Sequence, residues 1–419
     1  MIKMFRMPVL GTVLAASVLL TVPAYAMSGP KHTGPEPSST TASTVSALPV
    51  ATGRGRIVST QHVTGLTAAQ TRRFLVSRQF GSPLARDGID MYRLRYRTIG
   101  TTGAPTTASG LIAVPRTRST ALNVVSYEHG TTVPKNEVAT VDTTGYDAAA
   151  AAMFASAGYL TVAPDYLGLG SGPGTHPYMD HAAEVTSSLD LLRAARTFAQ
   201  QHGIRLRPAV RVTGFSQGGT AAMALGQALQ HRQLPGFGIA AVAPVSGPYD
   251  LQHDELPIAL NTRQLDSTEV SFYIAYLTVA WSHVYPSAIP AHPFTSRYTH
   301  LIPRVFDGKH SDNDIYAALP ADVRTMITPQ WLAMLEHPSG RLLQALRLND
   351  RACNWAPSVP VHIWAAHGDR DVAFANSRTC QSDLAARGTK APITDVGNLD
   401  HNHSALVSFP QVLRWFATI

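Results

Sequence analysis

The stretch Val210-Arg211-Val212-Thr213-Gly214-Phe215-Ser216-Gln217-Gly218-Gly219 decides how this chain folds. Its β-branched start predicts a short strand, and the small residues from Thr220 to Leu229 predict a helix directly after it. Glycines at 214 and 218 lack a Cβ, so the backbone between strand and helix can turn sharply and is open to close approach. Ser216 is therefore a candidate nucleophile, placed where the helix dipole favours negative charge.

Strands and helices alternate on both sides of this turn. Two early strands, at 91–97 and 108–114, are predicted to pair antiparallel. Later strands are predicted at 122–127, 159–163, 239–245, 360–366 and 393–396, and helices at 67–80, 147–158, 182–202, 374–387 and 404–416. This alternation indicates the α/β class, with a mostly parallel central sheet and helices on both faces. Reactive groups in such a sheet collect at the carboxyl ends of the strands.

The alternation is interrupted once. Residues 251–350 carry short helical patterns, many prolines and an aromatic stretch from Ser271 to Tyr285. We predict that they form a helical cap, or lid, inserted after the sixth core strand. The core would then consist of residues 67–250 and 351–419. The aromatic stretch either lines an acyl pocket or packs as an ordinary buried helix.

The amino-terminal segment has the pattern of a targeting sequence. Lys3 and Arg6 precede an apolar stretch over residues 8–22, and Ala24-Tyr25-Ala26 provides a small-residue cleavage site. These features predict a signal peptide over residues 1–26, with an uncleaved anchor as the alternative. Residues 27–66, which begin rich in Ser, Thr, Pro and Gly, are predicted to be a flexible linker. The mature protein is therefore expected to be secreted or periplasmic.

Composition narrows the classes of partner and cofactor. The chain has 419 residues and a formal net charge of +7, but its basic residues are scattered without aromatic interleaving, which argues against nucleic-acid binding. The glycines at 168–174 lack the spacing of a dinucleotide-binding loop. Cys353 and Cys380 are the only cysteines. In an exported protein they are expected to form a disulfide, buried free thiols being the alternative. No Cys–His spacing suggests a metal site, and no cofactor is expected.

A serine nucleophile needs a base, and the base needs a carboxylate to orient it. Asp369 and Asp371 follow the predicted strand 360–366, and His401 and His403 follow the strand 393–396. Both segments therefore lie at the same sheet edge as Ser216. We favour His401 as the base, because it is nearer the strand end and leaves Ser404 to begin the last helix.

With these residues, the chain resembles the α/β-hydrolases, and among them exported lipases and esterases with a large cap. The resemblance covers residues from about 90 to 419, and its motifs are residues 127–131, 164–168, 214–219, 368–371 and the segment around His401. The family pattern Gly-Xaa-Xaa-Asp favours Asp371 over Asp369 as the acid, although the proline usual after the acid is missing. The family's His-Gly element implies that the backbone N–H of Thr131 joins that of Gln217 in an oxyanion hole.

The resemblance implies a serine hydrolase that cleaves carboxylic esters through Ser216, His401 and Asp371, with an acyl-enzyme intermediate. The expected partner is a small-molecule or lipid ester, with transient contact with a lipid surface as an option. Two other functions stay open at this point. One is a serine peptidase of the same fold, for which Asp254 and Glu255 of the cap could offer a polar subsite. The other is a non-catalytic binding protein.

Overall fold

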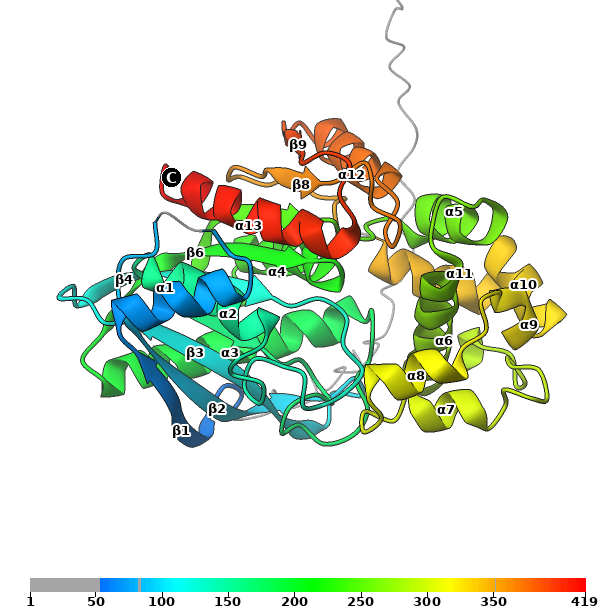
Figure 1. Ribbon diagram of the computed structural model, residues 1–419, viewed down its shortest axis with the longest axis horizontal. Helices are drawn as coiled ribbons and strands as arrows, with labels where there is room; N and C mark the ends of the chain where they lie inside the picture. Colours follow the sequence, from blue (N-terminus) through cyan, green and yellow to red (C-terminus); the bar gives the residue numbers. More distant parts are fainter. Residues whose placement is uncertain (1–52, 82–83, 351) are drawn as a thin grey trace, which may run out of the picture. The chain divides into compact units, whose positions relative to one another are not determined.

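Nine strands form one sheet in the order β1-β2-β3-β5-β4-β6-β7-β8-β9 (Figure 1). The computed structural model describes residues 53–81, 84–350 and 352–419, so the predicted signal peptide and residues 27–52 of the predicted linker lie outside the described part. The strands are β1 (Ile57–Leu66), β2 (Ile89–Ile99), β3 (Pro105–Pro115), β4 (Ala121–Glu128), β5 (Tyr159–Pro164), β6 (Arg205–Phe215), β7 (Gly238–Val245), β8 (Ile363–Ala365) and β9 (Ile393–Asp395). Strands β5, β4, β6, β7, β8 and β9 pair in parallel, whereas β1, β2, β3 and β5 pair antiparallel.

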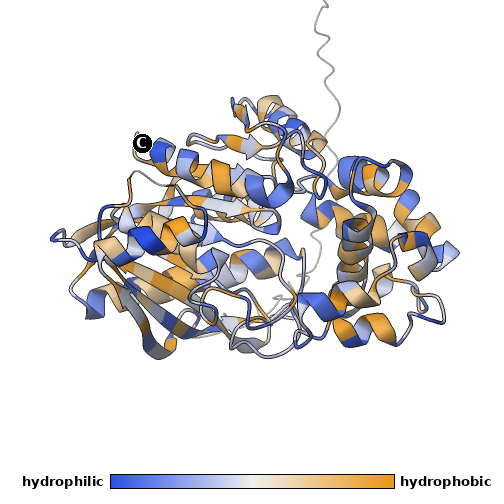
Figure 2. Cartoon of the chain, viewed as in Figure 1, coloured by the Kyte–Doolittle hydropathy of each residue, from blue (hydrophilic) through white to orange (hydrophobic). Residues whose placement is uncertain are grey.

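Helices cover both faces of the sheet, as the alternating pattern predicts. On one face, the core contains side chains from α1 (Ala68–Ser77), α2 (Tyr146–Ser156) and α13 (His401–Phe416). On the other face it contains side chains from α3 (His181–Gln201), α4 (Gln217–Gln230) and α12 (Ala375–Ala386). Hydrophobic residues run along the strands between these layers (Figure 2). The chain thus has the mixed sheet and two-sided helical cover of the predicted α/β-hydrolase fold.

The segment between β7 and β8 is mainly helical. Its helices are η1 (Leu251–Glu255), α5 (Leu256–Asn261), α6 (Ser267–Val284), η2 (Pro286–Ala288), α7 (Leu301–Val305), α8 (Asp312–Ala318), α9 (Val323–Met326), α10 (Pro329–Glu336) and α11 (Gly340–Asn349). They gather together in Figure 1 and share one hydrophobic cluster, which includes Trp281 and Trp331. Tyr178 and Met179, which precede α3, also pack in this cluster. The positions of the domain boundaries stay a prediction.

Two sequence-based boundaries need correction. The predicted linker extends too far, because Ile57–Leu66 pairs with β2 as the edge strand β1. Half of the residues in β1 are exposed and none is fully buried, and the sequence lacks the apolar alternation that marks a half-buried strand. The strand before the predicted cap is therefore the seventh, β7. The last helix begins at His401 rather than Ser404, because the Asp400 side chain accepts the backbone N–H of His403 and caps the helix there.

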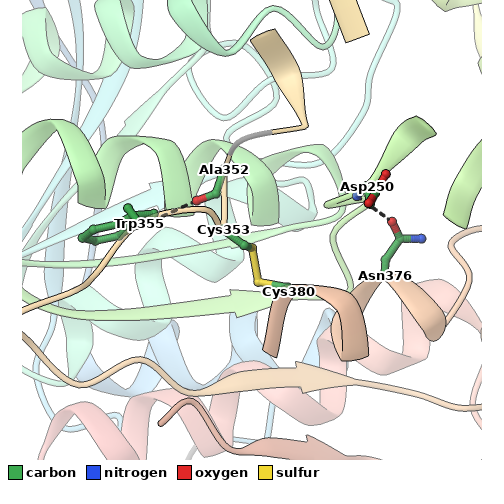
Figure 3. Close-up of a disulfide and its surroundings, with 6 residues drawn as sticks. All are labelled: Asp250, Ala352, Cys353, Trp355, Asn376 and Cys380. Carbon is green, nitrogen blue, oxygen red and sulfur yellow. Dashed lines mark hydrogen bonds between the residues drawn. A yellow bond between two sulfur atoms is a disulfide. The ribbon is translucent and has the colours of Figure 1, made fainter. Parts of the chain in front are cut away.

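Cys353 and Cys380 form a disulfide with an S–S distance of 2.00 Å, so the alternative of two free thiols does not hold (Figure 3). The bond joins the segment after α11 to α12, and both cysteines are buried in the core. Nearby, the Asn376 side chain of α12 accepts the backbone N–H of Asp250 at 2.9 Å (Figure 3). Helix α12 is therefore tied to both ends of the segment that holds the cap helices.

None of the helices in the described part of the chain combines the length and the apolar character that crossing a membrane requires.

Removing the disulfide should lower stability, because the bond restricts the unfolded chain over a separation of 27 residues. The double variant Cys353→Ala/Cys380→Ala should lose about 3.5 kcal/mol of unfolding free energy by the loop-entropy relation. Urea denaturation followed by circular dichroism measures this loss. Wild-type protein treated with a reductant serves as the matched control and should shift in the same direction. A denaturation midpoint unchanged in both samples would contradict the prediction.

Candidate active site

Ser216 occupies a sharp turn between β6 and α4, as predicted. Its φ of 56° and ψ of −122° lie outside the usual regions for a residue with a side chain, and it is 4% exposed. Such backbone strain persists only where the surroundings hold it in place. Here the Ser216 N–H donates to the Val245 carbonyl at 2.9 Å, which ties the turn to the end of β7.

The two glycines of the motif allow the backbone to crowd around Ser216. A Cβ at Gly214 would lie 2.1 Å from the carbonyl oxygen of Gly218. A Cβ at Gly218 would lie 2.1 Å from the carbonyl oxygen of Glu128, at the end of β4. No side chain fits at either contact, so β6, α4 and the end of β4 meet here through backbone alone.

His401 is paired with Asp369. The Nδ1 atom of His401 lies 2.6 Å from Oδ2 of Asp369, and both side chains are buried. The imidazole also packs against Phe215, with ring centroids 4.4 Å apart, and it lines the same cavity as Ser216. Its other nitrogen, Nε2, is buried and has no hydrogen-bond partner among the described residues. No hydrogen bond joins Ser216 to His401 within this part of the chain.

The prediction that Asp371 orients the histidine is wrong, because Asp369 occupies that position. The loop after β8 folds back on Asp369, whose Oδ1 accepts the backbone N–H groups of Asp371 and Val372 at 2.9 and 3.0 Å. The Asp371 residue instead lines the two cavities beside Ser216. His403, the alternative base, is exposed on α13 and pairs with Asp400.

The surroundings of His401 favour its charged form. Burial alone would lower the pKa of the imidazole, but the charge of Asp369 and its hydrogen bond raise the pKa above the usual 6.5. The charges of Asp371 and Glu255 add to this effect. The pair is thus arranged so that His401 can accept a proton at Nε2 while Asp369 holds the opposite side of the ring.

Two backbone N–H groups near Ser216 are free to bind an oxyanion. The predicted donors are those of Gln217, the first residue of α4, and Thr131, in the loop after β4. Neither donates a hydrogen bond to another described residue. The loop lies close to the nucleophile, since a Cβ at Gly130 would be 3.6 Å from Cβ of Ser216. Their role in catalysis stays a prediction.

Two cavities meet at Ser216. One has about 580 Å³ of empty space and mainly apolar walls from the cap helices, including Leu256, Val270, Ile274 and Leu277. The other has about 990 Å³ and also contains His401 and Thr131. The aromatic stretch of α6 packs in the hydrophobic cluster of the cap and also lines both cavities through Tyr273, whereas its role in an acyl pocket stays a prediction.

Among residues 53–81, 84–350 and 352–419, no three His, Cys, Asp or Glu side chains gather in a way that could hold a metal ion.

Comparison with known proteins agrees with this geometry. The family described as Secretory lipase matches residues 134–286, a segment that includes Ser216. The rice cell wall degrading esterase LipA from Xanthomonas oryzae has a similar structure, with 25% identity, a TM-score of 0.76, and coverage of 86% of this chain and 96% of that one. No curated protein sequence matches the chain. The chain is an α/β-hydrolase similar to lipases and esterases.

More distant hydrolases share the fold alone. A putative hydrolase from Legionella pneumophila is 24% identical, with a TM-score of 0.75 and coverage of 86% of this chain and 98% of that one. Candida antarctica lipase A is 15% identical, with a TM-score of 0.60 and coverage of 83% and 78%. Family and structural matches together place this hydrolase among the carboxylic-ester hydrolases.

A buried polar network, which the sequence did not reveal, lies behind the nucleophile of this hydrolase. The side-chain Nε2 of Gln217 donates to Oε1 of Glu184 at 2.7 Å and contacts Nε2 of His176 at 2.9 Å. His176 donates from Nδ1 to the Leu167 carbonyl at 2.9 Å. Burial lowers the pKa of His176 to about 3, so the ring is neutral, and burial raises the pKa of Glu184 to about 8. The network fixes the side chain of the residue whose N–H is a predicted oxyanion donor.

The raised pKa of Glu184 makes stability depend on pH in a defined direction. The folded protein keeps this proton up to about pH 8, whereas the unfolded chain loses it near 4.5, so the contribution of Glu184 falls as pH rises between these values. Glu184→Gln cannot ionise. We expect the wild type to lose stability relative to Glu184→Gln from pH 5 to pH 8, by at most about 1.4 kcal/mol per pH unit.

Urea denaturation of both proteins across this pH range measures the difference. A constant difference between the two proteins would show that Glu184 is ionised in the folded state. The variant Asp383→Asn, at a half-buried site on α12, controls for a general effect of removing one negative charge.

Proposed function

We propose that this hydrolase cleaves carboxylic esters with Ser216 as nucleophile, His401 as base and Asp369 as the orienting acid. One observation carries the assignment: a buried histidine, paired with a carboxylate, shares a cavity with a serine held at positive φ in front of a helix. This is the combination of nucleophile, base and orienting group that nucleophilic catalysis requires. The substrate is a small-molecule or lipid ester.

The chemistry proceeds in two acyl transfers. Oγ of Ser216 attacks the ester carbonyl carbon while Nε2 of His401 takes the hydroxyl proton. The carbonyl oxygen becomes an oxyanion, which accepts hydrogen bonds from the N–H groups of Gln217 and Thr131. The tetrahedral intermediate collapses, and His401 gives its proton to the leaving alcohol. Water, deprotonated by His401, then attacks the acyl-enzyme and releases the acid and free Ser216. Asp369 keeps the ring oriented throughout.

The position of His401 assigns the two cavities. The leaving oxygen must receive its proton from Nε2, so the alcohol half lies in the larger cavity, which contains His401. The acyl chain then occupies the smaller cavity, which lacks His401 and has mainly apolar walls. An acyl chain gains about 0.8 kcal/mol per buried CH₂ group in such surroundings.

Export of the protein is part of this proposal. It is supported by the basic and apolar pattern of residues 1–26, by the disulfide, which persists in oxidising compartments, and by the family name Secretory lipase.

The wild type should hydrolyse p-nitrophenyl butyrate, and Ser216→Ala should abolish this activity without unfolding the protein. Asp369→Asn should lower kcat by about 10⁴-fold, because the imidazole loses its correct tautomer. The matched variant Asp371→Asn, two residues away, should lose far less. Release of p-nitrophenol measures all four rates, and circular dichroism checks the folding.

If Asp371→Asn lowered kcat more than Asp369→Asn, Asp371 would be the orienting acid instead. Full activity in Ser216→Ala would show that Ser216 is not the nucleophile, and the proposed mechanism would be rejected.

The pH profile should report the raised pKa of His401. The imidazole acts as a base only when neutral, so kcat/KM should rise with pH through a midpoint above 6.5, the usual histidine value. Asp371 contributes to the raised pKa through its charge, so Asp371→Asn should move the midpoint to lower pH. Measuring kcat/KM from pH 5 to 9 tests both statements. A midpoint below 6.5 in the wild type would contradict the assigned surroundings of the base.

A further inference from the structure

The larger cavity beside Ser216 is acidic although the protein as a whole is basic. The chain carries a formal net charge of +7. Among the residues that line this cavity there is no lysine or arginine, whereas five carry carboxyl groups: Glu137, Asp147, Glu269, Asp312 and Asp371. They come from separate parts of the chain, with Glu269 on α6, Asp312 on α8 and Asp371 after β8.

Among these carboxylates, Asp371 has no hydrogen-bond donor within the described part of the chain. Asp147 accepts the hydroxyl of Tyr127 at 2.7 Å, and Glu269 accepts that of Tyr316 at 2.8 Å. The carboxyl groups of Glu137 and Asp312 hydrogen-bond to each other and so share a proton, whereas no group of the described residues donates to the carboxylate of Asp371. Partly buried negative charge without a partner is costly, and a cation in the cavity would offset this cost.

The raised pKa values of these carboxyl groups show the same cost of negative charge in the cavity. Burial raises the pKa of Asp371 to about 6, and the charges of Glu269 and Asp369 add to the effect. Burial and the neighbouring Asp312 raise the pKa of Glu137. Asp371 is thus ionised above about pH 6 and lies in both cavities that contain the nucleophile.

Aromatic rings share the walls with these carboxylates. Phe272 of α6 and Tyr316 of α8 stack with ring centroids 5.3 Å apart and an interplanar angle of 7°. Tyr146 also lines the cavity, and its buried hydroxyl has no partner among the described residues. Aromatic faces attract cations, and quaternary ammonium groups are bound by such rings in other sites. Acidic and aromatic walls therefore favour the same class of ligand.

The cavity must receive a ligand, because it contains the catalytic pair. His401 is only 4% exposed, and its unpartnered Nε2 is the atom that gives the proton to the leaving oxygen. We infer that the alcohol half of the preferred ester carries a positively charged ammonium group, bound by Asp371 and the neighbouring acidic and aromatic side chains. The inference rests on the proposed ester hydrolysis and adds the charge of the substrate to it.

A pair of esters that differ only in charge tests the inference. Butyrylcholine and 3,3-dimethylbutyl butyrate have the same shape, with N⁺ in one where the other has carbon. We expect kcat/KM of the wild type to be about tenfold higher, or more, for the cation. Asp371→Asn should lower this ratio severalfold. The control Asp383→Asn removes the same charge from α12, outside both cavities, and should keep the wild-type ratio.

Binding of choline to the inactive variant Ser216→Ala, measured by calorimetry, provides a readout that does not depend on turnover. We expect choline to bind more tightly than 3,3-dimethylbutanol, and Ser216→Ala/Asp371→Asn to lose this preference.

Each other outcome would overturn the inference. Equal kcat/KM for the two esters would show that charge is not recognised. If glycerol monobutyrate were hydrolysed faster than both esters, the carboxylates of the cavity would bind the hydroxyl groups of a neutral alcohol rather than a cation. In either case the hydrolysis of the neutral ester keeps the proposed function intact, whereas a wild type inactive on every ester would count against the proposed function itself.

Discussion

The contact between three backbones at Gly214, Gly218 and the end of β4 is the constraint on which this site depends. A Cβ at either glycine would lie 2.1 Å from a backbone carbonyl oxygen. The turn at Ser216 therefore cannot change its backbone path unless a central strand moves as well. This contact holds the hydroxyl of Ser216 at the edge of the sheet, aims the start of α4 at it, and brings the loop of Thr131 beside it. The proposed nucleophile and the predicted oxyanion donors are therefore positioned by the same packing contact.

Sequence patterns predicted the features that arise from residues close together in the chain. The strand–helix alternation predicted the sheet and its two helical layers, and the Gly-Xaa-Ser-Xaa-Gly turn predicted Ser216. They could not separate Asp369 from Asp371, because both follow the same strand and only the folding of the loop decides which one faces His401. His401 was the favoured base, but one of the two reasons for it, a helix beginning at Ser404, was incorrect.

The burial of several carboxyl groups could not be predicted from the sequence. Glu184 lies on α3, a helix that the sequence predicted over residues 182–202, yet its side chain contacts Gln217 on the following helix α4 rather than solvent. Nothing in its neighbours along the chain marks it as buried, because its partners lie far away in sequence. The acidic wall near Ser216 is similar, since Glu269 and Asp312 belong to cap helices that meet the core only in the folded state.

The cap segment leaves and re-enters the core at nearly the same place. Asp350, at its end, accepts the backbone N–H groups of Leu251 and Gln252 at its start, and α12 holds both ends through Asn376 and the disulfide. The cap is also held to the core away from these ends, because the Gly308 carbonyl between α7 and α8 accepts the backbone N–H of Lys135 at 2.9 Å, and the Tyr276 hydroxyl donates to the Thr132 carbonyl at 3.1 Å. Since the polypeptide departs and returns at neighbouring points, the length of this insertion can change without displacing the strands on either side of it.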